Sequence, residues 1–184
     1  MMGDSPVISV FGSSATTPDQ AAWREARQLG RILAEAGAKV ATGGYGGTME
    51  AVSEGASAGG GEVIGITAPN VFPHRAGPNR FVRTEIPAHD IYERDRYLLG
   101  MASATITLPG SIGTIVEFSE AWREALLSPP AQRKPHVAVG ENFRRLADLM
   151  VTEFGVDPEA MICVSTASEA ARVVLDRLGL THTR

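Results

Sequence analysis

The segment 108–117 places a glycine turn, Pro-Gly-Ser-Ile-Gly-Thr, between a short apolar run and a helical pattern. A strand that feeds such a turn directs backbone N–H groups and the positive end of a helix dipole at one point, which suits a phosphate group. We expect Gly110 to adopt a positive φ for the reversal, Gly113 to let an anion approach the backbone, and Thr114 to donate its hydroxyl. The segment therefore predicts handling of a nucleotide or a sugar phosphate.

The same segment also has an ordinary structural interpretation. Thr114, followed by Glu117 three residues later, matches a capping box, and glycine turns between strands and helices are common. The segment has neither the Gly-Lys-Ser/Thr ending of an ATPase loop nor the G-x-G-x-x-G of a dinucleotide fold, so the fingerprints of those two classes are absent.

A second glycine turn supplies context for the first. Residues 42–50, Thr-Gly-Gly-Tyr-Gly-Gly-Thr-Met-Glu, follow the apolar run 39–41 and lead into another helical pattern. In open α/β sheets such turns gather at the carboxyl ends of the strands, where ligands bind. We therefore expect the two turns to share one ligand.

Strand and helix patterns alternate along the whole chain, which is typical of a parallel sheet with right-handed crossovers. The prediction is a single domain over residues 1–184, a three-layer α/β/α, Rossmann-like fold with a doubly wound, mainly parallel sheet. Residues 68–88 are rich in proline and have no regular pattern, so we expect a binding loop or lid there. The expected strands are 7–11, 39–42, 62–67, 104–108, 137–139 and 162–164, and the expected helices are 18–36, 48–58, 90–101, 114–127, 143–153 and 167–178.

Composition narrows the class of protein. With 43% hydrophobic residues in 184, the chain has enough apolar side chains for one sizeable core. A net charge of -4 argues against a nucleic-acid partner, and the lack of about 18 consecutive apolar residues argues against a membrane partner. The single cysteine, Cys163, favours the cytoplasm, and the histidines at 74, 89, 136 and 182 lack the spacing of metal ligands.

Five segments taken together resemble the LOG family: 10–14, 43–49, 60–66, 93–94 and 109–117. The resemblance covers roughly residues 7 to 150. LOG proteins were long labelled lysine decarboxylases, and they include phosphoribohydrolases that activate cytokinins. The resemblance implies hydrolysis of the N-glycosidic bond of a purine nucleoside 5′-monophosphate, which releases the free base and ribose 5-phosphate. It implies no metal or redox cofactor.

The resemblance also implies catalytic roles for Arg94 and Glu117. Breaking the bond between base and ribose builds positive charge on the sugar, so a nearby carboxylate can stabilise that charge and orient or deprotonate an attacking water. The planar fork of an arginine can hold a phosphate or the carboxylate itself. By residue type alone, the mixed charges of 90–96 are typical of a solvated helix face, so the expectation for Arg94 depends on the resemblance. The expected substrate and phosphate contacts are Gly12, Ser13, Gly43, Gly44, Gly46, Gly47, Thr48, Pro109, Gly110, Ser111, Ile112, Gly113 and Thr114.

Three positions depart from the family pattern. Ser111 replaces a glycine, Asp95 replaces a lysine, and Gly47-Thr48-Met49-Glu50 stands where Gly-Leu-Met-Gly is usual. Losing a cation beside a phosphate site weakens anion binding. The departures leave open a non-catalytic nucleotide or molybdenum-cofactor carrier. A DNA-processing module of the DprA type is a weaker alternative, since the chain has no basic stripe.

The resemblance further implies a homodimer. The helix that carries Trp122 and the pair Leu126-Leu127 offers apolar side chains for a shared face.

Overall fold

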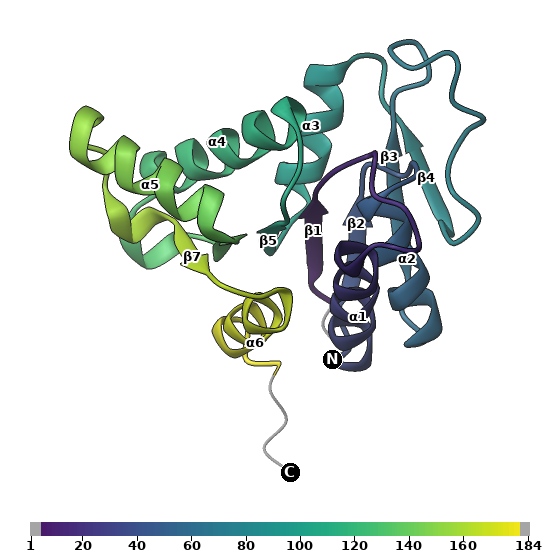
Figure 1. Ribbon diagram of the computed structural model, residues 1–184, viewed down its shortest axis with the longest axis horizontal. Helices are drawn as coiled ribbons and strands as arrows, with labels where there is room; N and C mark the ends of the chain where they lie inside the picture. Colours follow the sequence, from purple (N-terminus) through teal and green to yellow (C-terminus); the bar gives the residue numbers. More distant parts are fainter. Residues whose placement is uncertain (1–4, 181–184) are drawn as a thin grey trace.

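The computed structural model describes residues 5–180, so His182 and both ends of the expected domain lie outside the described residues (Figure 1). Within this range seven strands form one sheet in the order β4-β3-β2-β1-β5-β6-β7. Every neighbouring pair is parallel. The predicted three-layer α/β/α class is confirmed.

The strands and helices alternate as the sequence patterns predict, except that two strands follow each other directly between residues 63 and 87. The strands are β1 (Val7–Phe11), β2 (Lys39–Thr42), β3 (Val63–Thr67), β4 (Thr84–Pro87), β5 (Ala104–Thr107), β6 (His136–Val139) and β7 (Ile162–Val164). The helices are α1 (Ala21–Glu35), α2 (Thr48–Ala58), α3 (Ile91–Gly100), α4 (Ile112–Leu127), α5 (Glu141–Phe154) and α6 (Ala167–Arg177), with 3₁₀ turns at Pro130–Gln132 and Pro158–Ala160.

Helices cover both faces of the sheet, which explains why the central strands are buried almost throughout and are mostly apolar. Helices α1, α2 and α6 bury side chains such as Leu29 and Val174 against one face. Helices α4 and α5 bury Phe118 and Phe143 on the other face, where α3 adds Leu98. Within residues 5–180 no helix has the length and apolar character needed to cross a bilayer.

The strand order creates a switch point between β1 and β5. The chain moves outward from β1 through β2 and β3 to β4, and then returns through α3 to place β5 on the other side of β1. At such a point neighbouring connections leave the sheet in opposite directions, and a crevice opens beyond the carboxyl ends of the strands. In Figure 1, β1 points toward this end of the sheet, where α3 and the segment 68–83 lie.

Two helix starts differ from the expectation. Helix α1 begins at Ala21 rather than at residue 18, because the amide of Gln20 donates to the carbonyl of Thr17 (3.0 Å) and closes a separate turn. Helix α4 begins at Ile112 with Ser111 as its N-cap, so Thr114 lies inside the first turn. The capping-box interpretation of Thr114 and Glu117 is therefore wrong.

The segment 68–88 also differs in part from the expectation, because its last residues form strand β4. This strand pairs in parallel with β3 at the edge of the sheet and is mostly exposed. An edge strand tolerates Pro87 and does not need an apolar pattern, which is why no residue pattern indicated it.

Candidate functional site

Arg94 and Glu117 meet at the switch point, although they come from different helices. The Nη1 atom of Arg94 lies 3.4 Å from Oε1 of Glu117, and the two side chains are only 8% and 13% exposed. The Nε–H of Arg94 donates to the carbonyl of Ile66 at the end of β3 (3.0 Å), which fixes the direction of the guanidinium. The charged side chain is thus buried and held, rather than solvated as its neighbours in the sequence suggest.

A second carboxylate shares the same guanidinium. Oδ1 of Asp95 lies 3.7 Å from Nη1 of Arg94, is buried, and has no hydrogen-bond partner in the described part of the chain. Burial raises the pKa of Glu117 to about 7, Arg94 opposes the rise, and Asp95 adds to it. Burial likewise raises the pKa of Asp95 to about 6. The site therefore contains an acid that gains or loses its proton close to neutral pH.

Gly43 is required by this arrangement. A Cβ built on Gly43 would lie 1.6 Å from Nη2 of Arg94 and 2.7 Å from Sδ of Met49. Because the guanidinium occupies the space of a side chain, the first glycine of the second turn is needed for close approach rather than for an unusual φ. Met49, expected to be a core residue, is 6% exposed and also contacts Arg94 through its sulfur (3.9 Å).

The amides that begin α4 are open. The N-cap Ser111 makes no side-chain cap, and within the described residues the N–H groups of 110–114 donate no hydrogen bond. Gly110 does not have the expected positive φ, and the need for glycine there is explained instead by Oγ1 of Thr114, which would lie 2.2 Å from a Cβ. Nothing lies within 4 Å of a Cβ on Gly113. The open N–H groups leave the start of this helix available to an anion.

A cavity of about 220 Å³ joins these features. Seven of the residues expected from the sequence line it: Gly12, Gly43, Arg94, Ser111, Gly113, Thr114 and Glu117. The side chain of Ile112 is 75% exposed. The others, Ser13, Gly44, Gly46, Gly47, Thr48, Pro109, Gly110 and Ile112, are not part of this lining, and Gly46 lines a neighbouring cavity.

Part of the second glycine turn serves the fold. The amide of Thr48 donates to the carbonyl of Ser13 (2.8 Å), and a Cβ on Gly47 would lie 2.4 Å from the same oxygen. The hydroxyl of Thr48 bonds to that of Thr16 (2.9 Å). The start of α2 is thus capped by the loop after β1, whereas the start of α4 is open.

Sequence reasoning missed seven residues of the lining, namely Val10, Phe11, Ser14, Met49, Phe72, Arg75 and Ile91. Two of these, Phe72 and Arg75, lie close together. Both come from the irregular segment 68–83, which was expected to be a binding loop but without named residues. The guanidinium of Arg75 lies 4.4 Å from the ring centre of Tyr45 and 4.2 Å from that of Phe72. The sequence signal that could have indicated Arg75 is an arginine close to prolines, a glycine and an aromatic residue in an irregular segment.

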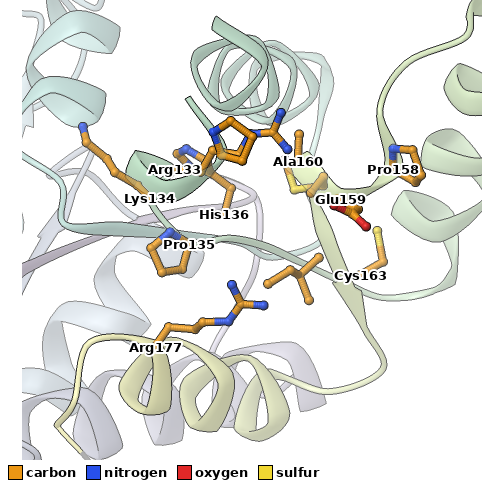
Figure 2. Close-up of a pocket in the computed structure, with 12 residues that line it drawn as sticks. Arg133, Lys134, Pro135, His136, Pro158, Glu159, Ala160, Cys163 and Arg177 are labelled. Atoms are coloured by element: carbon orange, nitrogen blue, oxygen red, sulfur yellow. The ribbon is translucent and has the colours of Figure 1, made fainter. Parts of the chain in front are cut away.

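A larger cavity of about 580 Å³ lies at the opposite end of the sheet, where β6 and β7 begin (Figure 2). Its lysine and one of its arginines are already paired: Arg133 with Asp157 (2.8 Å) and Lys134 with Glu124 (2.7 Å). Burial lowers the pKa of His136 to about 4, so its ring is neutral at pH 7. None of the residues expected to bind substrate lines this cavity, and we place the candidate site at the carboxyl end of the sheet.

Comparison with known proteins assigns the family. Residues 5–127 match the family described as SLOG cluster4. The chain belongs to the SLOG cluster4 family. The matched range includes both glycine turns, Arg94 and Glu117, and it ends with helix α4, so the SLOG cluster4 match contains the whole candidate site.

Two curated proteins are similar in sequence to parts of this SLOG cluster4 chain. It is 34% identical over 85 residues to a cytokinin riboside 5′-monophosphate phosphoribohydrolase from Mycobacterium marinum, a match to 46% of this chain and 45% of that protein. It is 32% identical over 128 residues to an uncharacterized protein from Archaeoglobus fulgidus, covering 67% and 80%. The match thus spans less than half the length of the curated phosphoribohydrolase.

A solved structure shares the fold over nearly the full length of both chains. The molybdenum cofactor binding protein from Rippkaea orientalis has a TM-score of 0.73 and 23% sequence identity, with 97% of this chain and 99% of that chain covered. At that level of identity the likeness concerns architecture alone.

Proposed function

We propose that this protein hydrolyses the N-glycosidic bond of a purine nucleoside 5′-monophosphate. The observation that carries the proposal is the buried Arg94–Glu117 pair, which lies in the same cavity as the open amides at the start of α4. A 5′-phosphate bound to those amides puts the ribose one helical turn away, which is where the carboxyl group of Glu117 is held.

Glu117 is the group that acts on water in this proposal. A water oxygen bonds to C1′ of the ribose while the C1′–N bond breaks, and the base leaves with the bonding electrons and takes up a proton from solvent. Glu117 takes the proton of the attacking water, and its negative charge stabilises the cationic sugar of the transition state. A carboxyl group whose pKa is raised to about 7 by burial is a stronger base than an exposed glutamate.

Arg94 orients Glu117. Its guanidinium is fixed by the carbonyl of Ile66 and reaches Glu117 with Nη1, so the carboxylate is presented to the cavity in one position. Met49 and Gly43 close the other side of the guanidinium. No step of the proposal requires a metal or a redox group.

Non-catalytic binding of a phosphorylated nucleotide or pterin is the second candidate. The observation in its favour is Asp95, which stands where the family motif has lysine and places a second carboxylate against Arg94. Saturable binding without turnover would support a carrier over a hydrolase.

The test is a hydrolysis screen with purified protein, AMP, GMP and N6-substituted AMP, followed by chromatography of the free base. We expect release of base from at least one monophosphate, and a fall of roughly 100-fold or more in kcat for Glu117→Gln. Glu153→Gln is the control, because Glu153 is an exposed residue of α5 and does not line the cavity. A fully active Glu117→Gln variant, or no cleavage of any monophosphate, would reject the proposal.

We also propose that the protein is a homodimer and acts in the cytoplasm. Helix α4 carries Leu127, 80% exposed, and Ile115 and Leu126 line an apolar groove of about 210 Å³ between α4 and α5. Exposed apolar surface of this kind is a feature of subunit interfaces. The cytoplasmic location is supported by the single free Cys163 and by the supply of nucleotide substrate.

A further inference from the structure

A second cavity adjoins the proposed active site. It has a volume of about 330 Å³ and shares two wall residues, Ser14 and Arg75, with the cavity that contains Glu117. The remaining residues of its lining are Tyr45, Gly46, Glu50, Ala76, Gly77 and Asn79. A ligand whose phosphate lies at the start of α4 therefore has room to extend past Ser14 and Arg75 into this space.

Glu50 offers an unused carboxylate to the second cavity. Its Oε2 lies 3.8 Å from the position of a Cβ on Gly46, so the carboxylate sits over the glycine turn. It forms no hydrogen bond or ion pair with residues 5–180.

Arg75 is held at the junction of the two cavities. Its guanidinium packs on the rings of Tyr45 and Phe72, and within the described part of the chain it has no acidic partner. The hydroxyl of Tyr45 accepts from the amide of Ala68 (2.8 Å), which fixes one of those rings. A planar guanidinium held in this way provides a surface on which a flat heterocycle can stack.

Asn79 does not compete for the ligand. Its amide nitrogen donates to the carbonyls of Gly44 (3.1 Å) and Tyr45 (3.0 Å), and its Oδ1 accepts from the amide of Phe81. The charged groups that the second cavity offers are therefore those of Glu50 and Arg75.

We propose that the second cavity binds the heterocycle of the ligand, and that Glu50 selects an edge with a ring N–H beside a 2-amino group, the N–H pattern shared by guanine and pterins. A carboxylate has two oxygens that accept hydrogen bonds in parallel, and this edge presents two adjacent N–H donors. Adenine instead presents one amino group beside an unprotonated ring nitrogen, which a carboxylate repels. The inference rests on the proposed placement of the phosphate at the start of α4.

The experiment measures binding by isothermal titration calorimetry with GMP, IMP, AMP and neopterin monophosphate. For the wild type we expect GMP or the pterin to bind at least tenfold more tightly than AMP, and IMP, which lacks the 2-amino group, to fall between GMP and AMP. For Glu50→Gln we expect the preference over AMP to fall below threefold. Glu54→Gln is the matched control, since Glu54 lies one turn further along α2, pairs with Arg27 and does not line the cavity.

The outcomes separate this inference from the hydrolysis proposal. AMP binding as tight as that of GMP and the pterin, an unchanged preference in Glu50→Gln, or no binding of any probe would overturn the role of Glu50. Cleavage of monophosphates without such a preference leaves hydrolysis standing and removes the inference. If Glu50→Gln abolishes the preference but no monophosphate is cleaved, the role of Glu50 stands and the hydrolysis proposal is rejected. If the pterin binds more tightly than GMP, the ligand that the second cavity prefers is a pterin rather than a guanine nucleotide.

Discussion

At the scale of single residues, the unusual feature is one guanidinium shared by two buried carboxylates. Arg94 lies within 3.4 Å of Glu117 and 3.7 Å of Asp95, and Asp95 has an oxygen without a hydrogen-bond partner among the described residues. Two like charges at one site make each other harder to ionise. In the proposed reaction, Asp95 therefore acts through the proton affinity of Glu117.

This feature predicts a shift in the pH profile of Asp95→Asn. The proposed reaction needs Glu117 ionised, so kcat/KM of the wild type should rise with pH, with its midpoint near the pKa of about 7. The negative charge of Asp95 raises that pKa, so its removal lowers the pKa and moves the rising limb to lower pH. The measurement is kcat/KM between pH 5 and 9, together with NMR titration of the Glu117 carboxyl carbon.

Asp176→Asn is the control for that prediction, because Asp176 lies on α6, at the other face of the sheet. Asp176→Asn should change neither the midpoint of the kcat/KM pH profile nor the pKa of Glu117 measured by NMR. An unchanged or higher midpoint in Asp95→Asn would mean that Asp95 does not influence Glu117.

At the scale of elements, helices α1 and α2 approach each other through glycine. A Cβ on Gly30 of α1 would lie 2.1 Å from the carbonyl oxygen of Val52, and a Cβ on Gly55 of α2 would lie 1.8 Å from that of Arg27. Both glycines are thus needed for backbone contact. This contact matters for function because α2 carries Met49 and Glu50 to the two cavities.

Gly30→Ala should therefore destabilise the protein, even though alanine favours helices by about 1 kcal/mol over glycine. The added methyl group forces the two helices apart, which is a form of overpacking. Overpacking lowers the free energy of unfolding by about 3 kcal/mol at the upper end of its usual range. The melting temperature should fall by roughly 5–10 °C. Thermal unfolding followed by circular dichroism measures the change.

Gly100→Ala is the matched control, since Gly100 is also helical and nothing lies within 4 Å of its Cβ position. It should be neutral or slightly stabilising. A Gly30→Ala protein as stable as Gly100→Ala would show that the two helices can separate without cost.

At the scale of the whole molecule, apolar side chains remain exposed on the helices that cover one face of the sheet. Leu127 at the end of α4 is 80% exposed and Phe154 at the end of α5 is 69% exposed. We expect a dimer of twice 19.5 kDa by light scattering at micromolar concentration. Leu127→Arg should shift the population toward the monomer, because a charge buried at an interface without a partner is strongly unfavourable.

Ser168→Arg is the control for the dimer, because Ser168 is an exposed residue of α6, which covers the opposite face of the sheet. The same charge placed there should leave the dimer intact. A wild-type protein that scatters as a monomer would contradict the dimer outright. Dissociation by Ser168→Arg instead would place the interface on the face covered by α1, α2 and α6.

The order and nature of the elements could be predicted from the chain alone, because apolar periodicity and glycine stops are local signals. The helix stops at Gly37 and Gly179 have positive φ as those signals require, and Thr166 caps α6 through the amide of Glu169. Strand β4 was not predicted, because an exposed edge strand has no apolar periodicity. The role of Arg94 came from family resemblance alone, since its neighbours are charged.

Which groups meet depends on the three-dimensional arrangement. The return of the chain from β4 to β5 places α3 beside α4, and this brings Arg94 to Glu117 across 23 residues of sequence. Burial then sets the proton affinities of Glu117 and Asp95, and no sequence pattern encodes burial at a crevice. Tertiary contacts also decide which helix has unpaired amides at its start, because the loop after β1 caps α2 and leaves the amides of α4 free.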